Sequence, residues 1–190
     1  MDLGLRRKVA LVTAASRGLG AATAMAFARE GASVAACARN RAQLMETCHG
    51  IADATGAEVL AVTADVSKPA DIERLVSSTV DRVGQLDSLV IDAGGPPTGT
   101  FSDLEQADGE RAAQLTLMSA VRLCYATGPV MKRGGGGSIL AITSLSVKQP
   151  LDNLILSKSL RLGVIGLVKS LSNELGADGI RVNAICPGWT

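Results

Sequence analysis

The sequence predicts an α/β fold, in which a doubly wound parallel sheet carries helices on both faces. Short apolar runs of strand length alternate with helical patterns along the whole chain, and short loops join them. Hydrophobic residues make up 47% of the 190 residues and aromatic residues only 2%, so small aliphatic side chains must fill the core. That composition suits helices layered on a buried parallel sheet.

The elements follow one another without an internal repeat. The predicted strands cover residues 8–13, 33–37, 58–63, 88–92, 138–143 and 181–185, and the predicted helices cover residues 18–30, 41–55, 69–83, 105–132 and 153–175. Ser67 stands at a capping position, Pro69 falls in the first turn of its helix, and glycines lie at or just past helix ends. Strict alternation implies right-handed crossovers and a sheet wound from its centre.

Charge and composition exclude several classes of function. The net charge of +1, with no basic run longer than Arg6-Arg7-Lys8, argues against nucleic-acid binding. No stretch approaches the roughly 20 apolar residues of a membrane span, so we expect a cytoplasmic protein with one domain over residues 1–190. The four cysteines are scattered, which favours buried thiols in a reducing compartment, and the lone His49 has no second metal ligand at suitable spacing, so no metal site is expected.

A glycine-rich loop joins the first strand to the first helix. It reads Thr13-Ala14-Ala15-Ser16-Arg17-Gly18-Leu19-Gly20. A helix that begins in such a turn points free backbone N–H groups and a positive dipole end at an anion, and glycines let a pyrophosphate approach the backbone. The pattern predicts a dinucleotide site whose loop contacts come from Thr13, Ser16, Arg17, Gly18, Leu19 and Gly20.

Two arginines indicate which dinucleotide binds. Arg17 lies in the loop, and Arg39 lies just past the second strand, where an acidic residue would bind the ribose hydroxyls of NAD. A guanidinium there suits a 2′-phosphate, and no carboxylate competes between Val34 and Asn40. We therefore expect NADP(H); the alternative is a pair of solvated surface arginines.

Together with later motifs, this loop resembles a known family. The motifs are Thr13 with Gly18 and Gly20, Asp65-Val66, Ala93-Gly94, Ser144, and the segment from Arg181-Val182-Asn183 through Pro187-Gly188. They are similar to the classical short-chain dehydrogenases/reductases, and among these to the 3-oxoacyl-acyl-carrier-protein reductase-like proteins. The resemblance covers essentially the whole chain and implies a Rossmann-type dinucleotide-binding domain.

The resemblance implies further cofactor contacts. Asp65 would meet the adenine edge with Val66 packed beside it, and Ala93 with Gly94 would line the ribose side. Pro187 and Gly188 would shape the nicotinamide end. Two alternatives stay open, namely that Asp65 serves a turn or a helix start and that Pro187-Gly188 is an ordinary turn.

The same resemblance exposes an altered catalytic set. The family uses Asn, Ser, Tyr and Lys, and these positions hold Thr116, Ser144, Ser157 and Arg161. Ser157 and Arg161 keep the four-residue spacing and so face one side of a helix. Arg161 could hold the nicotinamide ribose, but Ser157 is a poor general acid because its pKa is far above that of tyrosine. Tyr125 should lie on the helix face opposite Thr116 and so should not replace the missing tyrosine.

Two other positions depart from the family pattern. Ala14 replaces its first glycine, and Ile91-Asp92 replace a pair of asparagines. Family members also continue past the Pro-Gly motif, so we expect a chain that lacks the C-terminal part of the family fold.

Two functions from different classes remain. The first is an NADP(H)-dependent oxidoreductase acting on a small-molecule carbonyl or alcohol, with proton donation by Ser157, a water or the substrate itself. The second is a catalytically inactive NADP(H)-binding sensor or scaffold. Because family members commonly associate through the helices predicted at 105–132 and 153–175, a homodimer or homotetramer is expected.

Overall fold

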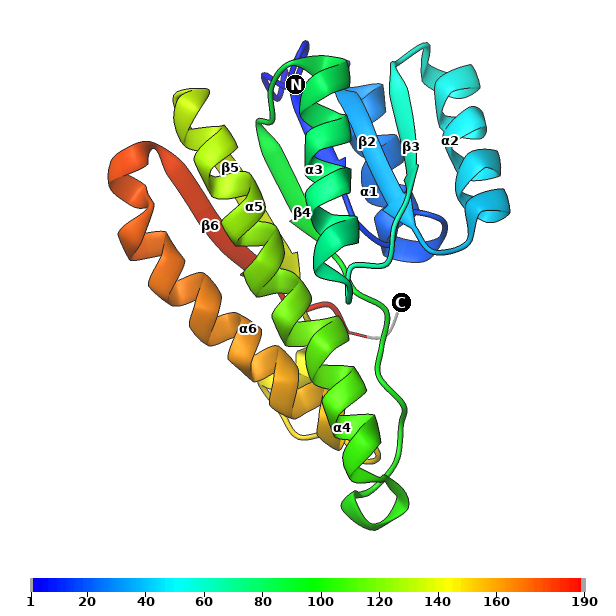
Figure 1. Ribbon diagram of the computed structural model, residues 1–190, viewed down its shortest axis with the longest axis vertical. Helices are drawn as coiled ribbons and strands as arrows, with labels where there is room; N and C mark the ends of the chain where they lie inside the picture. Colours follow the sequence, from blue (N-terminus) through cyan, green and yellow to red (C-terminus); the bar gives the residue numbers. More distant parts are fainter. Residues whose placement is uncertain (1, 189–190) are drawn as a thin grey trace.

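The computed structural model describes residues 2–188 and contains a six-stranded parallel sheet with the strand order β3-β2-β1-β4-β5-β6 (Figure 1). The strands are β1 (Val9–Val12), β2 (Ser33–Ala38), β3 (Val59–Thr63), β4 (Ser88–Ile91), β5 (Gly137–Ile142) and β6 (Ile180–Ile185). The chain starts at the centre of the sheet, winds outward through β2 and β3, and then returns to add β4, β5 and β6 on the other side. The predicted doubly wound parallel sheet is confirmed.

Helices cover both faces of the sheet. They are α1 (Gly18–Arg29), α2 (Arg41–Thr55), α3 (Pro69–Val83), α4 (Gln106–Ala112), α5 (Ser119–Arg133) and α6 (Ile155–Glu174). Buried side chains of α3, α5 and α6 form one core cluster with the sheet, and those of α1 and α2 form a second cluster on the opposite face. Rossmann-type layering follows directly from this arrangement.

The central strands are apolar on both sides because helices bury both faces. Leu11 of β1 and Leu89 of β4 point into the α3–α5–α6 cluster, whereas the next residues along, Val12 and Val90, point into the α1–α2 cluster. All four side chains are almost fully buried. Continuous apolar runs of this kind are typical of central parallel strands.

Helix ends follow the glycine and proline signals, with one correction. Gly56 and Gly84 adopt left-handed φ values of 69° and 76° directly after α2 and α3, a conformation that glycine adopts without a Cβ clash. Pro69 occupies the first turn of α3, but the N-cap position before it belongs to Lys68, whose side chain makes no capping hydrogen bond. The predicted capping role of Ser67 is therefore wrong, because its hydroxyl donates to Asp65 Oδ1 instead, at 2.7 Å.

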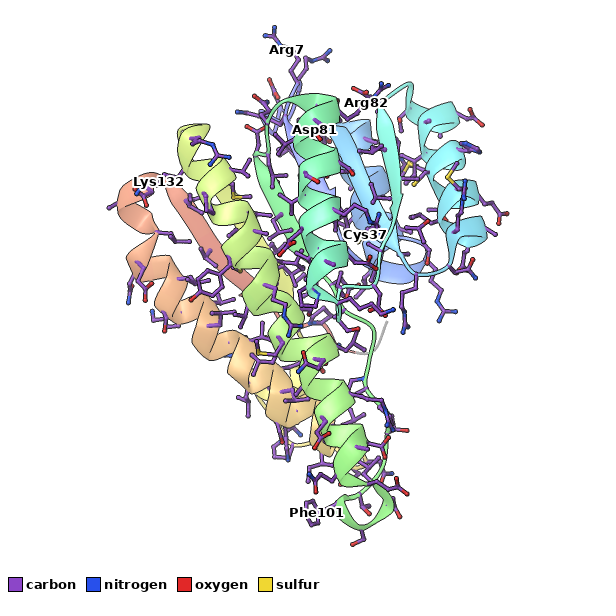
Figure 2. All side chains as sticks on the ribbon, in the orientation of Figure 1. Arg7, Cys37, Asp81, Arg82, Phe101 and Lys132 are labelled. Carbon is purple, nitrogen blue, oxygen red and sulfur yellow. The ribbon has the colours of Figure 1, made fainter. Side chains whose placement is uncertain are left out.

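The long helix predicted at 105–132 contains an irregular segment. A π-helical turn, Ala113–Met118, separates α4 from α5. Together with the start of α6, α4 extends beyond the sheet, at the lower end of Figure 1. Phe101 lies at the tip of this extension with 83% of its surface exposed, far from Cys37 in the sheet (Figure 2).

Membrane-spanning helices and clusters of metal ligands are both absent from residues 2–188. No helix in this part of the chain is both long and apolar enough to span a membrane. Nor do three or more His, Cys, Asp or Glu side chains come together there in a way that could hold a metal ion.

Candidate functional site

A cleft of about 330 Å³ opens where the carboxyl ends of β1, β2, β3 and β4 meet. The loop after each strand contributes to its wall, because parallel strands all end at the same edge of the sheet. Of the residues predicted to bind cofactor, the cleft brings together Ser16, Arg17, Arg39, Asp65, Val66, Ala93 and Gly94. Residues from four separate loops thus surround one cavity.

The loop after β1 packs tightly beneath the first turn of α1. A Cβ atom on Gly20 would lie 2.5 Å from the Ala14 carbonyl oxygen, so only glycine fits there. Arg17 is the N-cap residue of α1, and its side chain makes no capping hydrogen bond to the first turn, where Gly18 and Leu19 are exposed. Ala14 has a φ of +52°, a left-handed conformation that strains any residue with a Cβ. Uncapped N–H groups beside an arginine suit a phosphate.

Thr13 lies inside the protein, and its side chain is not part of the cleft wall. Its hydroxyl donates to the Asp92 carbonyl oxygen at 2.6 Å and accepts from the Asp92 N–H at 2.8 Å. These two bonds tie the end of β1 to the segment after β4. Thr13 therefore supports the two loops that form the floor of the cleft.

The cleft also contains residues that were not predicted from the sequence. Asn40 and Gln43 line it, and the Asn40 side chain caps α2 by accepting from the Gln43 N–H at 3.1 Å. An asparagine between a strand and a helical pattern is a capping signal that could have located this turn. Asp65 is both a cleft residue and a turn residue, since its Oδ1 accepts from the Ser67 N–H at 3.0 Å. Cys37 also lines the cleft, where burial raises the pKa of its thiol to about 12.

Ser144 lies beside the Pro187-Gly188 segment. It follows β5, and together with Leu145, Leu151, Leu154, Pro187 and Gly188 it lines a second cavity of about 110 Å³. The Leu145 N–H donates to the Pro187 carbonyl oxygen at 2.8 Å, which fixes the two segments against each other. Three predicted site residues are therefore adjacent, in a cavity whose wall, as far as residues 2–188 form it, has no charged side chain.

Ser157 and Arg161 lie on one face of α6, as their spacing predicts. Arg161 Nε donates to Ser157 Oγ at 3.2 Å. Its Nη1 donates to the carbonyl oxygens of Ile142 and Thr143, at 3.0 and 3.2 Å, and its Nη2 donates to that of Ala93 at 3.3 Å. A guanidinium has five N–H groups, so these four bonds leave one for a ligand. Arg161 joins the end of β5 to the loop after β4.

Thr116 lies in the π-helical turn, and its hydroxyl is buried without a hydrogen-bond partner among the described residues. Together with Arg161 and Ala93, it lines a cavity of about 10 Å³, which is about the size of one water. Tyr125 of α5 is 80% exposed, whereas Thr116 is 3% exposed.

Arg161 and Asp92 influence each other's pKa. Burial lowers the pKa of the Arg161 guanidinium, and the negative charge of Asp92 limits this change. Burial raises the pKa of the Asp92 carboxyl, and the positive charge of Arg161 limits that change.

Curated proteins of similar sequence are dehydrogenases and reductases. A short chain dehydrogenase/reductase of Aspergillus oryzae, astE, is 31% identical over 97% of this chain and 71% of its own length. The ketoacyl reductase HetN of a Nostoc strain is 33% identical over 97% of this chain and 64% of its own length. The chain thus spans only part of each relative.

Solved structures of similar fold have different nicotinamide cofactors. An L-sorbose reductase of Gluconobacter frateurii, complexed with NADPH and L-sorbose, has a TM-score of 0.96 and 34% identity, covering 99% of this chain and 72% of that one. A 7α-hydroxysteroid dehydrogenase complexed with NADH has a TM-score of 0.91 and 32% identity, and the match covers 97% of this chain and 72% of that one.

The family model described as short chain dehydrogenase matches residues 8–190. This match spans the sheet, the cleft and positions 116, 144, 157 and 161. The chain belongs to the short-chain dehydrogenase family.

Proposed function

We propose that the chain binds NADP(H) in the cleft at the carboxyl ends of β1–β4. The observation that carries this proposal is the position of Arg17 and Arg39, from two different loops, in the wall of one cavity. Two guanidinium groups suit phosphate oxygens, and the uncapped first turn of α1 adds N–H donors. No acidic residue of the loop after β2 lines the cleft to favour a free ribose hydroxyl.

The cleft suits the other parts of the dinucleotide as well. Asp65 Oδ1 accepts from Ser67, so its other carboxylate oxygen would accept from an adenine amino group. Ala93 and Gly94 would face the ribose, because small residues leave space there. The remaining Arg161 N–H would donate to a ribose hydroxyl, and Pro187-Gly188 would adjoin the nicotinamide.

We further propose that the site reduces a small-molecule carbonyl, or oxidises the corresponding alcohol, as 3-oxoacyl reductases do. When bound, NADPH supplies the hydride for the carbonyl carbon. Ser144 donates a hydrogen bond to the carbonyl oxygen, which polarises the bond to be reduced. Ser157 Oγ accepts from Arg161, so its own proton remains free to be donated. A water or an acidic substrate are the other candidate proton sources.

Turnover of small keto compounds tests the enzymatic proposal. We expect NADPH oxidation with a keto ester such as ethyl acetoacetate, and a loss of at least about tenfold in kcat/KM with Ser144→Ala. Ser159→Ala, an exposed position on α6, serves as the control and should leave the rate unchanged. Equal rates for the wild type and Ser144→Ala would contradict the proposal.

A second candidate function is binding without catalysis. The observation that favours it is that three of the hydrogen bonds donated by Arg161 go to carbonyl oxygens of the main chain, so few N–H groups are left for a ligand. In addition, position 157 holds a serine and not a tyrosine. Such a protein would sense NADP(H) or present a nucleotide-dependent surface to a partner. Micromolar NADPH binding with no turnover, even after Ser157→Tyr combined with Arg161→Lys, would favour this function.

We also propose that a second copy of the chain binds on α5 and α6. A groove of about 410 Å³ runs between these helices, lined mainly by aliphatic side chains and by the exposed Tyr125. Exposed aromatic side chains at an apolar groove are typical of interfaces. Light scattering should give a dimer or tetramer that Tyr125→Glu dissociates; a monomeric wild type would contradict this.

We propose a cytoplasmic location for the protein. Three of its cysteines, Cys37, Cys48 and Cys124, are buried as free thiols, which is consistent with a reducing compartment.

A further inference from the structure

A second serine contacts the predicted catalytic serine. Ser146 lies in the short 3₁₀ turn after β5, two residues beyond Ser144, and only 1% of its surface is exposed. Its hydroxyl lies 3.0 Å from Ser144 Oγ, and its backbone N–H lies 3.1 Å from the same atom. No role for Ser146 was predicted from the sequence.

The direction of these bonds follows from the surroundings of Ser146. If Ser144 donated to Ser146, the Ser146 proton would be buried with no acceptor, because its hydroxyl has no other partner among the described residues. The arrangement without that penalty has Ser146 as the donor. A serine hydroxyl has two lone pairs and one proton. Both lone pairs of Ser144 are then occupied, by the O–H and the N–H of Ser146, and only its proton is free.

The free proton of Ser144 borders an apolar cavity. Among the described residues, the rest of the wall of this cavity comes from Leu145, Leu151, Leu154 and the Pro187-Gly188 segment, none of which has a side-chain acceptor. A ligand with a carbonyl oxygen would supply one. A hydroxyl that accepts hydrogen bonds is polarised and becomes a stronger donor, so Ser146 would strengthen the bond from Ser144 to that oxygen.

We propose that Ser146 is a positioning residue that fixes Ser144 as a hydrogen-bond donor toward a carbonyl substrate. This inference rests on the proposed reductase function for its substrate, but the geometry of the serine pair can be tested without turnover. The Ser146 hydroxyl acts only through Ser144 and does not touch the substrate.

The first test replaces the accepting hydroxyl with a thiol. In a Cys186→Ser background, which removes the other cysteine that is not buried, Ser144→Cys introduces a thiol whose pKa is measured from thiolate absorbance. Donation from Ser146 stabilises the thiolate, so adding Ser146→Ala should raise the pKa of this thiol by about 1 to 2. Thr79→Val is the matched control, because it removes a buried hydroxyl of α3 that bonds only to the main chain, and it should leave the thiol pKa unchanged.

An unchanged thiol pKa after Ser146→Ala would overturn the proposal. So would an equal change with Thr79→Val, because the effect would then reflect a general loss of packing. This outcome is independent of the proposed reductase function, which fails separately if the folded, NADPH-binding wild type reduces no ketone.

The second test is a double-mutant cycle on ketone reduction. Ser146→Ala should lower kcat/KM for ethyl acetoacetate by about 3- to 10-fold without changing the Kd of NADPH, whereas Ser146→Thr, which keeps a hydroxyl, should restore part of the rate. In a Ser144→Ala background, Ser146→Ala should have almost no further effect. Multiplicative losses in the two variants would mean that Ser146 acts independently of Ser144, and the proposal would be wrong.

Discussion

Gly20→Ala tests the close packing of α1 on the loop after β1. The new Cβ would lie 2.5 Å from the carbonyl oxygen and 2.8 Å from the carbonyl carbon of Ala14. Both are main-chain atoms that cannot rotate away, so the cost should reach the upper end of overpacking, about 3 kcal/mol. The better helix propensity of alanine offsets at most about 1 kcal/mol. We expect a net loss of about 2 kcal/mol in the free energy of unfolding, which corresponds to about 4–8 °C in Tm.

Urea unfolding followed by circular dichroism measures this change, and a second glycine provides the control. Gly50 lies exposed within α2, and a Cβ there would meet no atom within 4 Å. Gly50→Ala should therefore stabilise the protein by about 0.5–1 kcal/mol. Gly20→Ala should also weaken NADPH binding, because the clash displaces the first turn of α1. An unfolding midpoint for Gly20→Ala equal to or above that of the wild type would refute the packing argument.

Three further predictions, two for substitutions and one for thiol labelling, have defined outcomes. Ala14→Gly should raise the free energy of unfolding by about 0.5–1 kcal/mol, because glycine adopts a φ of +52° without strain; a decrease on urea titration would contradict this. A hydrogen bond from the Asp65 N–H, and to a smaller extent one from Arg74, lowers the pKa of the Asp71 carboxyl. The ionised Asp71 carboxylate therefore contributes to stability above about pH 4, and this contribution is lost as the pH falls through the lowered pKa. Asp71→Asn should then be less stable than the wild type at pH 7 and equally stable once the carboxyl is protonated; a difference independent of pH would argue against this pairing. In the folded protein only Cys186 should react rapidly with a disulfide reagent at neutral pH, because the other cysteines are buried; fast labelling of more than one thiol would contradict their burial.

The fold was predictable because its signals are local. Apolar runs, the Pro69 turn and glycines such as Gly56 each act within a few residues, and both faces of the central strands are buried. The cleft was predictable for a related reason, since residues that follow parallel strands gather at one edge of the sheet. Position after the second strand therefore located Arg39, and the family resemblance located Asp65.

Details that depend on tertiary contacts were not predictable. The bonds from Arg161 to three carbonyl oxygens join segments far apart in the chain, and no local pattern encodes them. The π-helical turn at Thr116 was missed because its apolar pattern continues that of the flanking helices. Ser67 and Ser146 were misjudged or overlooked because a serine hydroxyl has several possible partners within two residues, and only the folded turn selects one.

Binding of NADPH and NADH to the wild type, Arg39→Ala and Arg41→Ala, followed by cofactor fluorescence, tests the central claim most directly. Arg39 lines the cleft, whereas Arg41, two residues further along, is exposed and does not. We predict that the wild type prefers NADPH. Arg39→Ala should weaken NADPH binding by about 10- to 100-fold, because the charge-assisted bonds to the 2′-phosphate are lost. NADH binding and the Arg41→Ala variant should be unaffected. Equal affinities for the two cofactors, or an unchanged Kd for NADPH in Arg39→Ala, would contradict an NADP(H) site.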